Sequence, residues 1–273
     1  SPEPRSHGGW AVLAWAVATV LAAVVALGVV AQEALTTRSG QELDQSAMES
    51  VYAREDAVGQ LLSVLGYISI GTTALALLVC VGLALVRHRY AAAGAAVTVV
   101  AGANVTTQAL KNYVLDRPDF GNLTLNSLPS GHTTVVTSIV LAALLVAPRS
   151  LRLAVAGLGT GAVTFTGAST IVAGWHRPSD VLAALAVSLA WGSAAVVALT
   201  VRRRAGFSRD GVAVSTVSLL GTLVAGAVLV VLGVRPLGGW TGFGDAAVVL
   251  GVVGLACSVV VAWFARLASV HAA

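Results

Sequence analysis

The chain has 273 residues, of which 57% are hydrophobic and only 10% are charged, and its mean hydropathy is +0.87. Soluble globular domains carry about 25% charged residues, so this composition excludes an ordinary soluble enzyme and indicates a membrane protein. The formal net charge of +4 would also suit a nucleic-acid-binding protein, and the positions of the basic residues decide between the two classes.

Long apolar segments recur along the whole chain. A helix needs about 20 apolar residues to cross the ~30 Å hydrocarbon core of a bilayer, and eight segments approach or exceed this length. The fourth is short, and we expect it to begin within the polar stretch before it. The sequence therefore predicts an all-α membrane protein with about eight transmembrane helices. The segments are Trp10–Ala31, Leu61–Val86, Ala91–Leu115, Thr133–Ala147, Leu153–Ala173, Val181–Val201, Val212–Val234 and Ala246–Ala268.

The first apolar segment has an alternative interpretation. Val29 and Ala31, at its end, have the spacing of a signal-peptidase site. Its apolar run is longer than the roughly 7–15 residues of a signal-peptide core, so we expect a retained helix.

Arginines gather in the loops of one side. Acidic residues dominate the first loop of the other side, between positions 33 and 56. Because basic loops stay in the cytoplasm, we expect both termini to be cytoplasmic. The membrane that we expect is a bacterial plasma membrane. The basic charge then reflects topology, and no nucleic-acid partner is expected. The arginines are Arg5, Arg87, Arg89, Arg149, Arg152, Arg202, Arg203, Arg204, Arg209 and Arg266.

Two loops suggest further organisation. The loop 32–60 places Leu43, Ala47 and Val51 at four-residue steps, which predicts a short surface helix. The run RRRAGFSRD separates the last two apolar segments from the others. We therefore expect a six-helix core, residues 1–205, followed by an appended transmembrane hairpin, residues 206–273.

Three polar clusters fall on the same, extracytoplasmic side in this topology. They are KNYVLDRPDF after the third segment, SLPSGHTT before the fourth, and STIVAGWHRPSD between the fifth and sixth. Ionisable residues at a membrane boundary are costly and usually functional. The clusters are therefore the candidates for a site.

In the second cluster, Ser130 is a good N-cap for a helix that begins at Gly131. The free N–H groups of such a helix end, with a glycine that allows close approach, form an anion site. His132 would lie in the first turn, beside the anion. The alternative is a plain helix cap that carries an incidental histidine.

In the third cluster, Pro178 suits the first turn of the sixth helix. Asp180 can then accept a hydrogen bond from one nitrogen of His176, which leaves the other nitrogen free to attack or to carry a proton. The alternative is an interfacial ion pair.

The first cluster adds Lys111 and Arg117, two cations suited to phosphate, or alternatively two snorkelling side chains. Together the clusters hold the groups that phosphoryl transfer needs. No tight set of zinc ligands occurs, and Cys80 and Cys257 lie within apolar segments, so neither a metal nor another cofactor is expected.

The three clusters resemble, in order, the signatures of the type 2 phosphatidic acid phosphatase superfamily. PSGH matches fully, and His176 and Asp180 stand at the family spacing from Ser169. The resemblance covers about Leu61–Val201, with its specificity in the motif region 111–180.

The resemblance implies a metal-independent membrane phosphatase with a six-helix core. His176 would be the nucleophile that forms a phosphohistidine, Asp180 would orient it, and His132 would be the general acid and then the base. By the same resemblance, the phosphoryl group would be held by Lys111, Arg117, Ser130 and Gly131.

Two positions depart from the family pattern. Five residues separate Lys111 from Arg117, where the family usually has six. Because one residue turns a helical side chain by about 100°, Lys111 would point in a different direction from the family lysine unless the helix contains a bulge. Thr170 replaces the arginine that normally follows Ser169. Arg177 is the nearby cation that could replace it.

The predicted function is hydrolysis of a lipid phosphomonoester or diphosphate, such as a polyprenyl diphosphate or phosphatidate, at the extracytoplasmic face. A phosphotransferase of the same fold and a non-catalytic lipid-phosphate binding or transport protein are the alternatives. The expected partners are the lipid phosphate and the bilayer. The lipid tail and the oligomeric state are left open.

Overall fold

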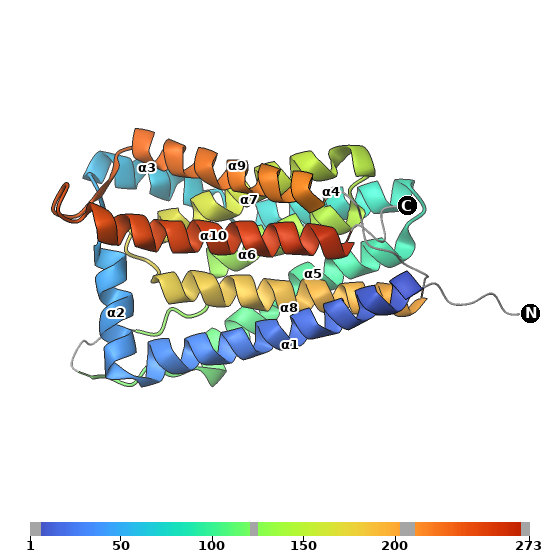
Figure 1. Cartoon of the computed structure of the whole chain (residues 1–273), viewed down its shortest axis with the longest axis horizontal. Helices are drawn as coiled ribbons and strands as arrows, with labels where there is room; N and C mark the ends of the chain where they lie inside the picture. The colour runs from blue at the N-terminus through green and yellow to red at the C-terminus, as the bar shows by residue number, and fades with distance from the viewer. Residues whose placement is uncertain (1–6, 121–124, 203–210, 269–273) are drawn as a thin grey trace, which may run out of the picture.

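The structure is a computed structural model that describes residues 7–120, 125–202 and 211–268. It is a bundle of long helices that run side by side, with one short helix across its end (Figure 1). The helices are α1 (His7–Thr36), α2 (Arg38–Glu49), α3 (Glu55–Gly66), α4 (Ile70–Val86), α5 (Tyr90–Ala109), the π-helix η1 (Leu110–Val114), α6 (Gly131–Val146), α7 (Arg149–Val172), α8 (Pro178–Arg202), α9 (Gly211–Val231) and α10 (Phe243–Ala268), and the strands are β1 (Val51–Ala53) and β2 (Val234–Pro236).

The helices confirm an all-α membrane protein. Among the described residues, six helices are long and apolar enough to cross a bilayer, or seven if the bent pair α3 and α4 counts as one span, and α6 is a shorter apolar helix. The predicted span Leu61–Val86 is divided between two helices, because the chain bends by 52° between α3 and α4. Ser69 ends the continuity: its hydroxyl accepts a hydrogen bond from the Thr72 amide, and the Thr72 hydroxyl accepts one from the Ser69 amide. This capping box starts a new helix at Ile70.

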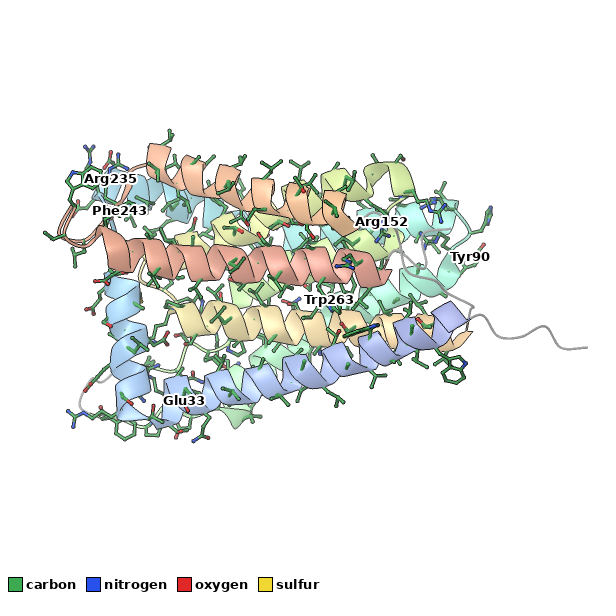
Figure 2. The ribbon with its side chains drawn as sticks, viewed as in Figure 1. Glu33, Tyr90, Arg152, Arg235, Phe243 and Trp263 are labelled. Carbon is green, nitrogen blue, oxygen red and sulfur yellow. The ribbon has the colours of Figure 1, made fainter. Side chains whose placement is uncertain are left out.

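The two ends of the bundle differ in the residues they carry. Helix α1 begins and α10 ends at one end, whereas α8 begins at the other, beside α2 (Figure 1). Arg152, from a predicted cytoplasmic loop, lies toward the first end, and Glu33 lies at the second (Figure 2). This separation agrees with the predicted topology, although the compartment that each end faces stays a prediction. Arg5, Arg203, Arg204 and Arg209 lie outside the described residues.

The last two membrane helices pack closely against the rest of the bundle. A Cβ on Gly221 of α9 would lie 2.1 Å from the Gly157 carbonyl oxygen of α7, so these two backbones approach each other as small residues allow in membrane helices. Hydroxyl groups join α9 to both α7 and α10: the Thr222 hydroxyl lies 3.1 Å from that of Thr164 on α7 and 2.6 Å from that of Ser258 on α10. The division at residue 205 stays a prediction, and the described part of α9 and α10 is packed as part of one bundle.

The helix predicted in the first loop is α2 (Arg38–Glu49), and its buried face carries polar side chains. Leu43 is 71% exposed, whereas Gln41 is 1% and Asp44 is 7% exposed. The polar side chains turn inward because each has a hydrogen-bonding partner in a distant segment, and burial of a paired polar group costs little. Helix α2 runs across the end of the bundle where α8 begins (Figure 1).

A short pair of strands, which the sequence analysis did not predict, fixes the chain after α2. Strands β1 and β2 are antiparallel, with Tyr52 opposite Arg235. The Leu237 amide also donates a 2.8 Å hydrogen bond to the Ser50 carbonyl oxygen. The loop between α9 and α10 is thereby attached to the C-terminal end of α2.

Candidate active site

The three polar clusters of the sequence meet at the end of the bundle where α8 begins. The Ser130 amide donates a 2.9 Å hydrogen bond to the Asp180 carbonyl oxygen, which joins the second cluster to the third. The Asn126 side chain donates a 2.9 Å bond to the Leu115 carbonyl oxygen, which joins the first cluster to the segment that leads into the second. The predicted site residues thus lie on segments that are joined by hydrogen bonds to backbone carbonyl oxygens.

His176 and Asp180 form the predicted pair. His176 follows α7, in the loop that leads into α8, and its Nδ1 lies 3.0 Å from Asp180 Oδ2. The same oxygen accepts hydrogen bonds from the Arg177 amide at 2.9 Å and from the Ser127 hydroxyl at 2.5 Å. Three groups converge on this one oxygen, which holds the carboxylate in place. Because an ionised carboxylate can only accept hydrogen bonds, the 3.0 Å contact assigns the proton of His176 to Nδ1. The lone pair of Nε2 is left free.

The start of α6 has the predicted helix cap. Ser130 is the N-cap, and its hydroxyl accepts a hydrogen bond from the Thr133 amide at 3.4 Å. The nearest atom to a Cβ built on Gly131 is the Gln108 side-chain nitrogen, at 3.7 Å, so the backbone there is accessible. His132 lies in this first turn, and its ring centroid is 5.5 Å from that of Trp175, the residue before His176.

Arg117 is a buried cation without a full set of partners. It is 9% exposed, and its Nε has no hydrogen-bond partner among the described residues. Burial and the like charge of Arg177 lower the pKa of Arg117 below its ordinary value. An anion bound between Arg117 and Arg177 would supply an acceptor for Nε. Its negative charge would also favour the charged form of Arg117 and so oppose the lowering of the pKa.

Lys111 lies on the π-helix η1, where the Leu115 amide bonds to the Leu110 carbonyl oxygen at 2.8 Å. A π-helix contains a bulge of the kind that the sequence analysis required if Lys111, one residue closer to Arg117 than in the family, is to point toward the site. Lys111 is half-buried and interacts electrostatically with Asp180 and His132. Lys111 is therefore close enough to Asp180 and His132 to be counted among the charged residues of the candidate site.

Thr170 and Arg177, the two positions that concern the missing family arginine, have different surroundings from each other. The Thr170 side chain is buried and donates to the Gly167 carbonyl oxygen at 2.8 Å. Its own carbonyl oxygen accepts the amide of His176 at 3.1 Å. Arg177 directs Nη1 to the Ser127 hydroxyl at 3.1 Å and Nε to the Gln45 side-chain oxygen at 3.0 Å, so its guanidinium lies next to the hydroxyl that also bonds Asp180.

Several residues at the site were missed by the sequence analysis. Ser127 was part of a quoted cluster, and its position before a predicted helix gave no reason to pair it with Asp180. Asp44 and Gln45 come from α2, where Asp44 accepts hydrogen bonds from the amide of Ser179, at 3.0 Å, and from its hydroxyl. Burial raises the pKa of Asp44, and these two hydrogen bonds act in the opposite direction.

Among the described residues, no group of three or more histidine, cysteine, aspartate or glutamate side chains is placed to hold a metal ion. The positively charged groups at this end of the bundle include the side chains of Lys111 and Arg117, beside the capped start of α6. Such donors can stabilise a phosphoryl group through electrostatics alone.

Comparison with known proteins identifies one relationship. Residues 92–205 match the model of the PAP2 superfamily, and this range contains all eight predicted site residues. No curated protein and no solved structure matches the chain. Members of the superfamily are phosphatases that act on phosphate substrates in a membrane. The match confirms the resemblance found in the motifs and supports membership of the type 2 phosphatidic acid phosphatase superfamily.

Proposed function

We propose that the protein hydrolyses the phosphate ester or diphosphate of a lipid, such as phosphatidate or a polyprenyl diphosphate, through a phosphohistidine on His176. The observation that carries this proposal is the buried His176–Asp180 pair, 3.0 Å apart. It shares one end of the bundle with a buried arginine that lacks a partner for Nε and with the capped start of α6.

In the first step, Nε2 of His176 attacks phosphorus and the bond from phosphorus to the leaving oxygen breaks. His132 gives its proton to that oxygen, and Asp180 stabilises the positive charge that develops on His176. In the second step, His132 takes a proton from water as the water oxygen attacks phosphorus. The phosphorus–nitrogen bond then breaks, and inorganic phosphate and free His176 result.

The charge of the phosphoryl oxygens would be balanced by Arg117, Lys111 and the amides that follow Ser130. Arg117 is the strongest of these candidates, because a buried guanidinium needs acceptors for its fixed set of donors. The backbone at Gly131 is open to close approach, which suits an anion at a helix start.

A lipid substrate is supported by the surroundings of the site. Tyr113 is 87% exposed at the end of η1, and Leu125 is 90% exposed in the segment before Ser127. In a membrane protein such exposed apolar side chains face the bilayer. A lipid could therefore keep its tail in the membrane while its phosphate reaches His176. We assign this end of the bundle to the extracytoplasmic side, as the arginine distribution predicts.

The experiment that tests the function is phosphate release by the purified protein in detergent, with phosphatidate, polyprenyl phosphates and polyprenyl diphosphates. Release from at least one class is expected. Complete absence of release, together with retained binding of the same lipids, would favour the non-catalytic alternative. Transfer of phosphate to an added alcohol at the expense of free phosphate would favour the phosphotransferase.

Phosphate release should be unchanged in EDTA. The proposed charge stabilisation comes from side-chain cations and backbone amides, which a chelator does not remove. The measurement compares initial rates with and without EDTA after dialysis against the chelator. A loss of rate that one divalent ion restores would show that a metal takes part.

Arg177→Ala should cost about 2–4 kcal/mol of transition-state stabilisation, as removal of other charge-stabilising donors does. We propose that Arg177 replaces the arginine that the family has at position 170. Introducing Thr170→Arg should restore part of the rate, and only part, because Thr170 is fully buried. The measurement is kcat/KM for the single and double variants.

Arg38→Ala is the matched control for this prediction. Arg38 lies on α2, and its side chain is exposed in a 3.0 Å ion pair with Glu42, so its removal should leave kcat/KM unchanged. If Arg177→Ala turns over like the wild type, Arg177 is not a replacement, and the anion is held by Lys111, Arg117 and the start of α6.

A further inference from the structure

Helix α2 lies outside the residues that match the PAP2 superfamily, 92–205, yet one of its faces contacts the candidate site. Asp44 is 7% exposed, and its carboxylate accepts the amide of Ser179 at 3.0 Å as well as the Ser179 hydroxyl. Ser179 is the second residue of α8. Its amide is one of the N–H groups that a helix start leaves without an internal partner. Asp44 therefore caps α8 from a different helix.

The residues that flank Asp44 on the same face of α2 contact the other parts of the site. Gln45 accepts a hydrogen bond from Arg177 Nε at 3.0 Å. Gln41 donates one to the carbonyl oxygen of Pro118, next to Arg117, at 3.0 Å. Positions 41, 44 and 45 are neighbours on one helical face. This single face thus holds both the segment of Arg117 and the segment that carries His176 and Asp180.

Helix α2 is itself fixed at both ends. Thr37 caps its start through the Gly40 amide at 3.0 Å. Its other end leads into β1, which pairs with β2 from the loop between α9 and α10. The last two helices, for which the sequence analysis gave no role, thereby supply the support that keeps α2 across the site.

We propose that Asp44 is a positioning residue of the phosphatase, which holds the first turn of α8 so that Asp180 meets His176 at the geometry required for attack. The proposal rests on the proposed function. Asp180 is the residue after Ser179, so a loosened first turn moves the carboxylate directly. Misplacement by about 1 Å at a reacting group can cost on the order of a hundredfold in rate.

The charge of Asp44 gives this role a kinetic signature. A carboxylate near Arg117 and Arg177 opposes the binding of an anionic substrate, and its electrostatic interactions include both arginines. Asp44→Ala should therefore lower kcat by about tenfold to a hundredfold while KM stays the same or falls. A variant that merely destabilised the protein would lower the amount of active enzyme and its melting temperature without this division between kcat and KM.

The experiment compares active-site-normalised kcat and KM on phosphatidate for the wild type, Asp44→Ala, Asp44→Asn and Glu42→Ala. Glu42 is the matched control because it is an acidic residue on the same helix, with an exposed side chain, and its loss should change neither constant. Asp44→Asn should be intermediate, since an amide oxygen can cap a helix but replaces only one of the two acceptors. If Asp44→Ala does not fold, Asp44→Asn carries the comparison.

A double variant separates positioning from an independent effect. If Asp44 acts through Asp180, then Asp44→Ala should lower kcat by less than about threefold in an Asp180→Asn background, because effects of residues that act as a unit are not additive. The proposal would be overturned if the loss of kcat in the double variant equalled the product of the losses in Asp44→Ala and Asp180→Asn. A wild-type kcat in Asp44→Ala alone would overturn it as well.

A second measurement does not depend on activity. Amide hydrogen exchange of the peptide that covers the first turn of α8 should become faster in Asp44→Ala and remain unchanged in Glu42→Ala. Absence of phosphate release by the wild type would overturn the proposed function alone, and the exchange result would still show whether Asp44 holds α8. Unchanged exchange in Asp44→Ala would overturn the positioning role whatever the activity.

Discussion

His176→Ala is expected to abolish phosphate release, with a loss on the order of 10⁶-fold in kcat, as when the nucleophile of a catalytic triad is removed. The variant has no atom that can attack phosphorus, and the charges around Arg117 can only bind the substrate. The protein should remain folded, because His176 lies in the loop after α7 and, within the described part of the chain, its side chain makes one hydrogen bond, to Asp180. Loss of one such bond costs about 1 kcal/mol.

Trapping the intermediate distinguishes the two histidines. After brief reaction with a labelled substrate and quenching at alkaline pH, the wild type should carry an acid-labile phosphoryl group on His176, and His176→Ala should carry none. His132→Ala is the comparison, because it should still accept the phosphoryl group, at a reduced rate. A phosphoryl group found on His132 instead would reverse the roles of the two residues.

The parts of the site that the sequence predicted correctly are those set by short-range geometry. Asp180 is the fourth residue after His176, and the pairing follows once Pro178 starts a helix. The helix cap at Ser130 likewise depends only on residues up to Thr133. These motifs all lie within residues 92–205, which match the family model, and the catalytic roles of the residues stay predictions.

The parts that were missed depend on contacts between distant segments. The spacing of Leu43, Ala47 and Val51 predicted the existence of α2 correctly, but it could not show that Gln41 and Asp44 had partners to bury against. Those partners are 77 and 135 residues away in the chain. Regular spacing of apolar residues shows which face of a helix is buried only when the polar residues have no hydrogen-bonding partners inside the protein.

Two features of the fold were hidden by their shortness. Strands β1 and β2 have three residues each, which is too few for an alternating pattern to stand out. The break between α3 and α4 falls in a run that stays apolar on both sides of Gly66, so hydropathy indicated one span. The capping sequence at Ser69 and Thr72 was the signal that indicated the start of a new helix. It is recognised from side-chain hydrogen bonding to the backbone, which a hydropathy profile does not include.

Asp180→Asn is expected to reduce kcat by about four orders of magnitude while substrate binding is retained, as for the corresponding change in Ser-His-Asp triads. Oδ2 of Asp180 accepts hydrogen bonds from His176, Arg177 and Ser127. Asparagine can place its oxygen at this position and keep the local structure, but it lacks the charge that stabilises a positive imidazole during attack. The measurement is single-turnover formation of the phosphoenzyme, with lipid affinity determined separately. Ser127→Ala is the control, because it removes one donor and leaves the charge, and it should cost far less. Wild-type rates in Asp180→Asn would show that the 3.0 Å pair with His176 has no part in the chemistry.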